Sequence, residues 1–220
     1  MNPTWESDGV QLYLGDALDV LPVLGSIDAV VTDPPYGLDY DPQRYNASTT
    51  TKSVFLPIEG DDVEFDPRPW LKFPTCLLWG ANNYTRHLPR AGWLCWDKRC
   101  NENADRMFGS PFELAWFRAP KRERVFKIAR IQHGGVVNAD GSGIKRVCPT
   151  QKPIALMLWC LEIAKYPDII LDPFMGSGTT GIACVRAGRR FIGIEKDEGY
   201  FNSAVERISE AQLQPRLEGT

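Results

Sequence analysis

The tetrapeptide Asp33-Pro34-Pro35-Tyr36 carries the residue types that a reaction at the exocyclic amine of a base would need. The lone pair of such an amine is delocalised into the ring, so the nitrogen becomes a good nucleophile only when two acceptors bind its two N–H groups. The Asp33 carboxylate offers one acceptor and the Pro34 carbonyl the other, because a Pro-Pro step is stiff. The Tyr36 ring could stack on the base. Taken alone, the tetrapeptide also fits a strand capped by prolines and a packed tyrosine.

The segment from Asp172 to Thr180, DPFMGSGTT, combines a predicted strand end, a glycine-rich turn and a helix start. Gly176 and Gly178 remove side chains where the backbone must approach a ligand closely. Glu195 ends the next predicted strand, 23 residues after Asp172. In dinucleotide-binding folds an acid about 20 residues past the glycine turn binds the ribose hydroxyls. The pattern therefore predicts a site for a ligand that contains adenosine.

The residues around this turn favour S-adenosylmethionine over nucleotides that carry phosphates. A P-loop needs Gly-Lys-Ser/Thr, whereas Gly178 is followed by Thr179-Thr180. Gly176, Gly178 and Gly181 do match the nicotinamide fingerprint, but the acid before the turn, Asp172, disfavours a pyrophosphate and suits an ammonium group. S-adenosylmethionine joins adenosine to an amino-acid ammonium without any phosphate. A tight turn that binds no ligand is the alternative that the glycines alone leave open.

Strands alternate with helices along the chain and place both motifs at strand ends. Apolar runs predict strands at 28–32, 75–80, 92–96, 113–117, 168–171 and 190–194, and helical patterns cover 153–165, 178–187 and 197–212. This alternation predicts an α/β, Rossmann-like fold with a mixed, mostly parallel sheet and helices on both faces. The length of 220 residues favours one domain, 1–220.

Two stretches, 37–69 and 119–150, lack regular patterning and read as long loops. The net charge of the chain is −3, but its distribution is uneven. Residues 1–66 contain thirteen acidic and two basic residues, whereas residues 118–152 contain nine basic and two acidic residues. The basic stretch is a candidate for binding nucleic-acid phosphates. On charge alone, the basic stretch fits a solvated surface loop equally well. In that case residues 37–69 would bind the nucleic acid instead.

The six cysteines form no CxxC pair, and we expect reduced, mostly buried thiols. A metal site built from Cys95, Cys100, His133 and Cys148 fits no ligand spacing known to us, so no metal is expected. No apolar run approaches the roughly 20 residues of a transmembrane helix. The polar N-terminus shows no signal-peptide pattern, so the expected compartment is the cytoplasm.

Four segments together resemble the beta class of DNA amino-methyltransferases. Asp33-Pro34-Pro35-Tyr36 resembles the catalytic motif and residues 172–180 resemble the cofactor loop. Thr150-Gln151-Lys152-Pro153 is similar to the TQKP element before that loop, and residues 15–18 are similar to an upstream GD element. The catalytic motif precedes the cofactor loop, as in that class, and the resemblance covers about residues 11–210. One departure is Cys148, where the family often has His.

The resemblance implies a role for each matching residue. The target base would be oriented and stacked by the catalytic residues Asp33, Pro34, Pro35 and Tyr36. Cofactor contacts would come from Asp16, Asp33, Thr150, Lys152, Asp172, Phe174, Gly176, Ser177, Gly178, Thr179 and Glu195, with Asp16 near the adenine, Glu195 at the ribose and Lys152 near the methionine end. DNA would be bound by a short recognition insertion at about 117–149, through the basic residues Lys121, Arg122, Arg124, Lys127 and Arg130.

The implied reaction is direct transfer of the methyl group of S-adenosylmethionine to N6 of adenine in double-stranded DNA. The target base would have to leave the duplex, and no covalent enzyme intermediate is expected. Cytosine-N4 enzymes of the family usually carry Ser in place of Asp33, which makes cytosine-N4 transfer the alternative. A catalytically idle nucleic-acid-binding subunit is a second alternative. No membrane partner is expected, and the sequence leaves open a homodimer and a cognate restriction enzyme.

Overall fold

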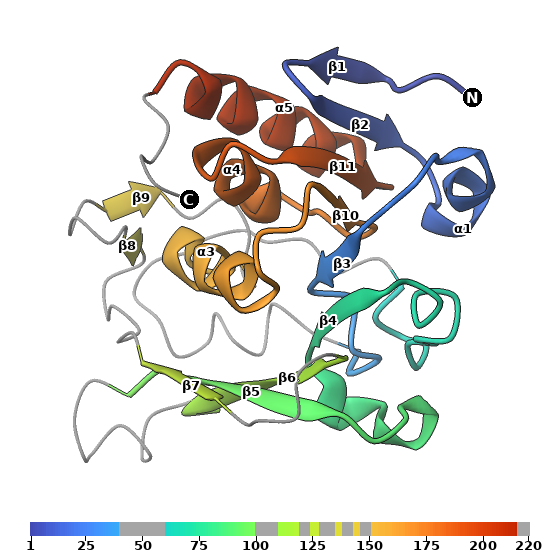
Figure 1. The fold of residues 1–220 in the computed structure, drawn as a ribbon, viewed down its shortest axis with the longest axis vertical. Coiled ribbons are helices and arrows are strands. Elements are labelled where there is room, and N and C mark those ends of the chain that lie inside the picture. Colours follow the sequence, from blue (N-terminus) through green and yellow to red (C-terminus); the bar gives the residue numbers. More distant parts are fainter. Residues whose placement is uncertain are drawn as a thin grey trace.

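The computed structural model describes residues 1–39, 60–99, 110–118, 124–127, 135–137, 143–145 and 151–214. Within these residues a nine-stranded sheet runs through the molecule in the order β1-β2-β11-β10-β3-β4-β6-β5-β7 (Figure 1). The predicted Rossmann-like α/β fold with a mixed, mostly parallel sheet is confirmed.

Five neighbouring strands form the parallel part of the sheet: β2 (Val10–Leu14), β11 (Arg190–Glu195), β10 (Ile169–Asp172), β3 (Ala29–Thr32) and β4 (Thr75–Trp79). A short strand, β1 (Trp5–Ser7), pairs antiparallel with β2 at the edge. All four residues of β3 are buried, as expected for a parallel strand covered on both faces.

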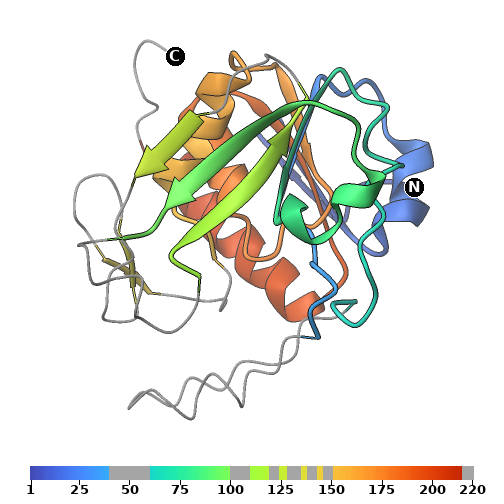
Figure 2. The same cartoon turned by 90° about the horizontal axis from the view of Figure 1, so that it is seen from below.

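In the other part of the sheet, one strand runs against the direction of its neighbours. β6 (Phe112–Phe117) runs antiparallel between β4 and β5 (Gly92–Asp97), and β7 (Arg124–Lys127) lies parallel to β5 at the outer edge (Figure 2). Glu113 pairs with Trp96 near the carboxyl end of β5. Because β6 runs in the opposite direction, its first residues lie at the edge where the parallel strands end.

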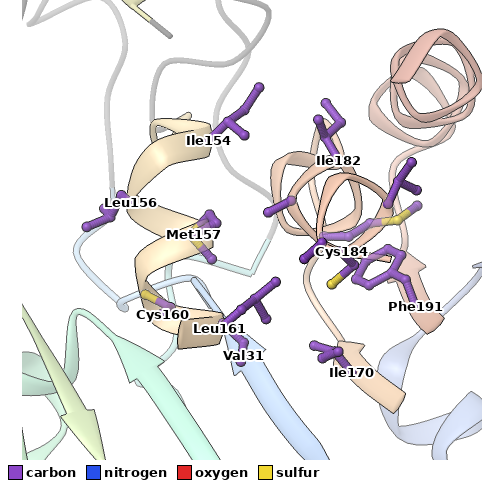
Figure 3. Close-up of a cluster of buried hydrophobic side chains, with 14 of the residues drawn as sticks. Val31, Ile154, Leu156, Met157, Cys160, Leu161, Ile170, Ile182, Cys184 and Phe191 are labelled. Carbon is purple, nitrogen blue, oxygen red and sulfur yellow. The ribbon is translucent and has the colours of Figure 1, made fainter. Parts of the chain in front are cut away.

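Three helices cover one face of the sheet: α3 (Ile154–Ile163), α4 (Thr179–Arg186) and α5 (Glu198–Gln212). Their apolar side chains pack on alternate residues of the strands, and Figure 3 shows Met157 and Leu161 of α3 and Ile182 of α4 above Val31 and Ile170. Pro153 precedes α3 and Asp197 caps α5, its carboxylate accepting a bond of 2.8 Å from the Tyr200 N–H.

The opposite face is covered by α1 (Ala17–Val20), by the 3₁₀ turns η1 (Leu21–Val23), η2 (Ala81–Asn83) and η3 (Thr85–His87), and by residues 60–73. Trp70, Tyr84 and Trp116 are fully or almost fully buried there. Val30 packs on this side and Val31 on the other, so β3 contributes to both cores.

Each predicted strand and helix is present within one or two residues of its expected bounds. The prediction of a patternless stretch at 119–150 is wrong for three segments: β7, and the pair β8 (Gly135–Val137) and β9 (Gly143–Lys145), which form a separate antiparallel sheet. Strands of three or four residues are too short to give a recognisable alternation of polar and apolar residues. The same reason explains why β1 was missed. Among the described residues, no helix combines the length and the apolar character that crossing a bilayer requires.

Candidate active site

The carboxyl ends of the parallel strands bring the two sequence motifs to one edge of the sheet. Asp33 directly follows β3 and Asp172 ends β10, and these two strands are neighbours. From β10 the chain continues to β11 on one side, whereas from β3 it continues to β4 on the other. Such a reversal of strand order is the place where open α/β sheets bind their ligands.

Asp172 connects the end of β3 to the glycine turn and to the start of α4. Its carboxylate accepts bonds of 2.6 Å from the Thr32 hydroxyl, 2.6 Å from the Thr180 hydroxyl and 3.1 Å from the Phe174 N–H. Burial raises the pKa of Asp172 to about 6, and these three bonds only partly oppose the effect. We predicted from the sequence that Asp172 suits an ammonium group, but both of its oxygens are engaged by the chain itself.

The glycine turn after β10 is hydrogen-bonded to Glu195. The N–H of Gly176 donates to Oε2 of Glu195 at 2.8 Å, and Oε1 accepts from the N–H groups of Lys196 and Asp197 at 2.8 Å each. Gly176 has a φ of 51°, and a Cβ built on it would meet nothing within 4 Å. The turn therefore presents open backbone beside an acid, which is what a ligand with hydroxyl groups needs.

Asp16 lies at the next strand end. Gly15 donates its N–H to the Glu195 carbonyl at 2.9 Å, so the start of α1 adjoins the end of β11. The Asp16 carboxylate caps α1 by accepting from the Leu18 N–H at 2.8 Å, and the residue is exposed.

The other predicted cofactor residues lie on the turn or behind it. Phe174 is half-buried and packs edge-on against Phe65 and Trp70, with ring centroids 5.5 and 5.7 Å away. The side chains of Ser177 and Thr179 are buried, and Gly178 packs so closely on α5 that an added Cβ would lie 2.9 Å from Cβ of Ala204. These residues shape the turn and the start of α4.

Tyr36 is held in place from several sides. Asp61 accepts bonds from the N–H groups of Tyr36 and Gly37 at 2.8 and 2.9 Å. The Tyr36 hydroxyl donates to Oδ1 of Asp33. The ring lies against Gly80, where an added Cβ would lie 1.9 Å from Cε1 of Tyr36. The tyrosine thus depends on an acid and a glycine from outside its own motif.

Asp33 belongs to a row of four charged side chains with alternating sign. Nζ of Lys152 lies 2.5 Å from Oδ2 of Asp33, 2.9 Å from Oε2 of Glu113 and 3.2 Å from the Tyr36 hydroxyl. Oε1 of Glu113 in turn lies 2.8 Å from Nζ of Lys98. Lys152 is only 5% exposed, and the other three side chains are between 9% and 25% exposed.

The surroundings of these groups shift their pKa values in different directions. Burial would raise the pKa of Glu113, but the ammonium groups of Lys152 and Lys98 outweigh it and lower the pKa to about 2. Burial opposes the charge on Lys152, yet Asp33 and Glu113 raise its pKa overall. Burial raises the pKa of Asp33, although Lys152 counteracts part of the shift. The Tyr36 pKa lies far above its usual range because of burial and the Asp33 charge.

The structure brings together Asp33, Tyr36 and Lys152, with Asp172 and the glycine turn adjoining them. Arg124 is exposed on β7, and Lys127 ends that strand. The remaining predicted residues, Lys121, Arg122, Arg130 and Thr150, lie outside the described residues.

Sequence reasoning missed four residues of this site: Asp61, Gly80, Lys98 and Glu113. Glu113 is a single acid at the start of an otherwise apolar strand, and Lys98 follows an apolar strand directly. A charge in such a place is a signal of a buried ion pair, and it could have drawn attention to both residues. Asp61 and Gly80 carry no comparable signal, because their roles depend on contacts with a motif far away in the sequence.

No group of three or more His, Cys, Asp or Glu residues in the described part of the chain could hold a metal ion. Of the four residues considered for a metal site, only Cys95 is described. The thiols of Cys76, Cys160 and Cys184 are free and buried.

Residues 117–206 match the family of DNA methylases. This segment includes the TQKP element, the glycine turn and Glu195, but not Asp33 or Tyr36. The chain is also 51% identical over 61 residues to the Type II methyltransferase M2.DpnII of Streptococcus pneumoniae. That alignment covers 27% of this chain and 23% of the relative's length.

Solved structures have a similar fold over most of the chain. The complex of M1.HpyAVI with S-adenosylmethionine superposes with a TM-score of 0.52 at 26% identity, covering 90% of this chain and 99% of the other. The cytosine-N4-specific PvuII DNA methyltransferase superposes with a TM-score of 0.61 at 17% identity, covering 96% and 94%. The second likeness concerns the fold alone. Residues 117–206 are therefore similar to DNA methylases, and the fold as a whole is similar to that of a solved DNA methyltransferase.

Proposed function

We propose that the protein transfers a methyl group from S-adenosylmethionine to the N6 amine of adenine in DNA. The observation that carries this proposal is the place of Asp33 at the point where strand order reverses, directly beside the strand that leads into the glycine turn. An acceptor for an amine and a turn open to a ligand therefore adjoin each other. The match of residues 117–206 to DNA methylases supports the same reaction class.

The cofactor is S-adenosylmethionine, and the residues at the turn fit it. Gly176 leaves open space where a side chain would project, and Glu195 stands beside it. Glu195 has accepting lone pairs beyond its three backbone bonds, which suit ribose hydroxyls. We assign Asp16 to the adenine end, and Phe174 with the turn 176–179 to the methionine end. When bound, the cofactor supplies a methyl group on a positively charged sulfonium.

The residues of the catalytic motif would prepare the target amine. Asp33 and the Pro34 carbonyl would accept the two N–H groups of the amine and draw its nitrogen toward tetrahedral geometry. Pro35 would keep that carbonyl in place, and the Tyr36 ring would stack on the base. The methyl group then passes directly to the nitrogen, which loses a proton afterwards, so no residue of the chain needs to become covalently modified.

We assign adenine as the target because Asp33 occupies the first position of the motif. Cytosine N4 is the competing target, since the fold also serves a cytosine-N4-specific enzyme. The two amines present similar N–H groups to the same pair of acceptors. Reaching either one requires the base to leave the duplex.

DNA binding is assigned to the basic insertion at about 117–149 of a single domain, through Lys121, Arg122, Arg124, Lys127 and Arg130. Arg124 and Lys127 lie on β7, at the outer edge of the sheet and next to β5, which Lys98 directly follows. DNA that contacts β7 would lie beside Lys98, which is the outer end of the row of four charged side chains that begins at Asp33. A homodimer and a restriction enzyme partner stay predictions from the sequence.

The test is a methylome readout in a host that lacks its own DNA methylation. Expression of the chain should produce N6-methyladenine in a fixed sequence context, and the Asp33→Ala variant should produce none while still binding S-adenosylmethionine. N4-methylcytosine in place of N6-methyladenine would establish the competing target. Absence of any mark from a folded, cofactor-binding protein would leave the idle subunit as the correct interpretation.

A further inference from the structure

Lys152 is the most deeply buried of the four charged side chains in the row, and it lies between two carboxylates. It comes from the segment before α3, whereas Asp33 follows β3 and Glu113 lies on β6. Removing three charges from water is costly unless each is paired. The fold meets that requirement with a fourth charge, Lys98, which pairs with the other oxygen of Glu113. The row Asp33, Lys152, Glu113, Lys98 is therefore neutral as a whole.

The ammonium of Lys152 donates hydrogen bonds to Asp33 and Tyr36 and forms an ion pair with Glu113. It has three N–H donors, and three acceptors surround it: Oδ2 of Asp33, Oε2 of Glu113 and the hydroxyl oxygen of Tyr36. The ammonium also lies 5.8 Å from the ring centres of both Tyr36 and Trp79. It is thus an amine nitrogen held against Asp33 and next to the ring on which a base would stack.

The bonds that Asp33 already accepts bear on its role as the acceptor for the target amine. Oδ1 of Asp33 accepts from Tyr36 and Oδ2 accepts from Lys152. A carboxylate accepts about four bonds, so a target amine that donates to Asp33 either shares an oxygen with one of these donors or displaces it. Glu113 gives the lysine a second place to bind, because its carboxylate already lies 2.9 Å from Nζ.

We propose that Lys152 is a positioning residue that stands in for the target amine at Asp33 and is retained by Glu113 when the base arrives. This inference rests on the proposed function. Before DNA binds, Lys152 keeps Asp33 ionised and its carboxylate oriented. When the base enters, its amine replaces Lys152 at Oδ2, and the ammonium keeps its contact with Glu113. Glu113 and Lys98 are then positioning residues for the same reaction.

The two neighbours of Asp33 should affect its protonation in opposite directions. Lys152 and the hydroxyl bond from Tyr36 favour the ionised carboxylate, whereas burial, Glu113 and the nearby acid Asp172 at the end of β10 oppose it. Tyr84 also interacts electrostatically with Asp33. Lys98 acts indirectly by neutralising Glu113. Loss of Lys152 therefore raises the pKa of Asp33, and loss of the Glu113 charge lowers it.

The experiment measures the pH dependence of the methyl-transfer rate for the full chain and two variants, Lys152→Met and Glu113→Gln, with S-adenosylmethionine saturating. The acid side of the profile should move to higher pH by about 1–3 units in Lys152→Met, as expected for loss of an adjacent opposite charge. In Glu113→Gln it should move to lower pH. The KM for DNA should also rise about tenfold or more in Glu113→Gln, because the displaced lysine loses a charged partner.

Two exposed residues at the far end of α3, Glu162 and Lys165, provide matched controls. Glu162→Gln and Lys165→Met make the same chemical changes at the opposite edge of the sheet and should leave the profile unchanged. Thermal unfolding shows whether each variant is folded. If Lys152→Met does not fold, Glu113→Gln decides alone, because it keeps the shape of the side chain.

The proposal is overturned if the acid side of the pH profile is unchanged in both variants or moves in the same direction in both. Such a result would indicate that the ion pair is only structural. Such a result leaves the proposed function intact as long as the wild-type protein methylates DNA. A wild-type protein that binds the cofactor but methylates no DNA overturns the proposed function, and this inference with it.

Discussion

Replacing Gly80 with Ala should abolish most of the activity without unfolding the protein. Gly80 follows β4 and lies directly behind the ring of Tyr36. An added Cβ would lie 1.9 Å from Cε1 and 2.3 Å from Cδ1 and Cζ. Carbon atoms in contact stay about 3.5 Å apart, so the tyrosine ring must move by more than about 1 Å. Its hydroxyl bond to Asp33 and its stacking position would move with it.

Two costs can be distinguished in this variant. Gly80 has a φ of 67°, and an alanine in the left-handed region costs about 1–2 kcal/mol of stability. The displacement of the ring affects the reaction itself, because misplacing a reacting group by about 1 Å can lower the rate about 100-fold. We therefore expect the transfer rate to fall by about two orders of magnitude, with only a modest decrease in melting temperature.

Gly60 provides a control for the backbone cost. It has a φ of 81°, and a Cβ added to it would meet nothing within 4 Å. Gly60→Ala should therefore lose a similar amount of stability but keep its transfer rate. The assay is single-turnover transfer of a labelled methyl group with saturating cofactor, alongside thermal unfolding and calorimetric binding of S-adenosylmethionine. A Gly80→Ala rate within a few-fold of the Gly60→Ala rate would refute the reasoning about Tyr36.

Three further predictions concern other parts of the molecule. Glu195→Gln should weaken S-adenosylmethionine binding by about 1.5–3 kcal/mol, the range for a hydrogen bond to a charged group, and unchanged affinity in calorimetry would remove Glu195 from the cofactor site. The pKa of Asp172 is raised to about 6, so its favourable effect on folding is present below about pH 4 and is lost as the pH rises through 6. Urea unfolding should show wild type losing about 3 kcal/mol relative to Asp172→Asn between pH 4 and pH 7, at about 1.4 kcal/mol per pKa unit, and parallel curves would contradict this. Replacing Lys121, Arg122 and Arg124 with Ala should weaken DNA binding and reduce the slope of its salt dependence by about 0.9 for each phosphate that the protein no longer neutralises, whereas an unchanged slope in fluorescence anisotropy would favour residues 37–69 as the DNA-binding segment.

The fold was predictable because its strands and helices are locally encoded. The run 28–32 ends at two prolines, Pro153 precedes a helix, and Gly188 follows one. These signals depend on neighbouring residues only. The short strands at 5–7, 124–127, 135–137 and 143–145 lack such signals, since they form through pairing with partners elsewhere in the chain.

The positions of the site residues were only partly predictable. Asp33 and Glu195 each stand at the end of an apolar run, and the fold class alone places such ends at one edge. The contact of Lys152 with Glu113 could not be derived in this way. It joins a segment before α3 to a strand that runs antiparallel to its neighbours, and only the order of β4, β6 and β5 brings the two together.

The two acids at the reversal of strand order differ in what binds them, and this difference separates their roles. Asp172 accepts bonds from the hydroxyls of Thr32 and Thr180 and from a backbone N–H, all of which are fixed in β3, α4 and the turn. An incoming amine could displace none of them without unfolding the edge of the sheet. Asp33 is bound by the side chains of Lys152 and Tyr36, which can rotate away from it. Of these two carboxylates, only the one of Asp33 can therefore exchange its partners for those of a substrate, and Glu113 is placed to accept the lysine that the exchange releases.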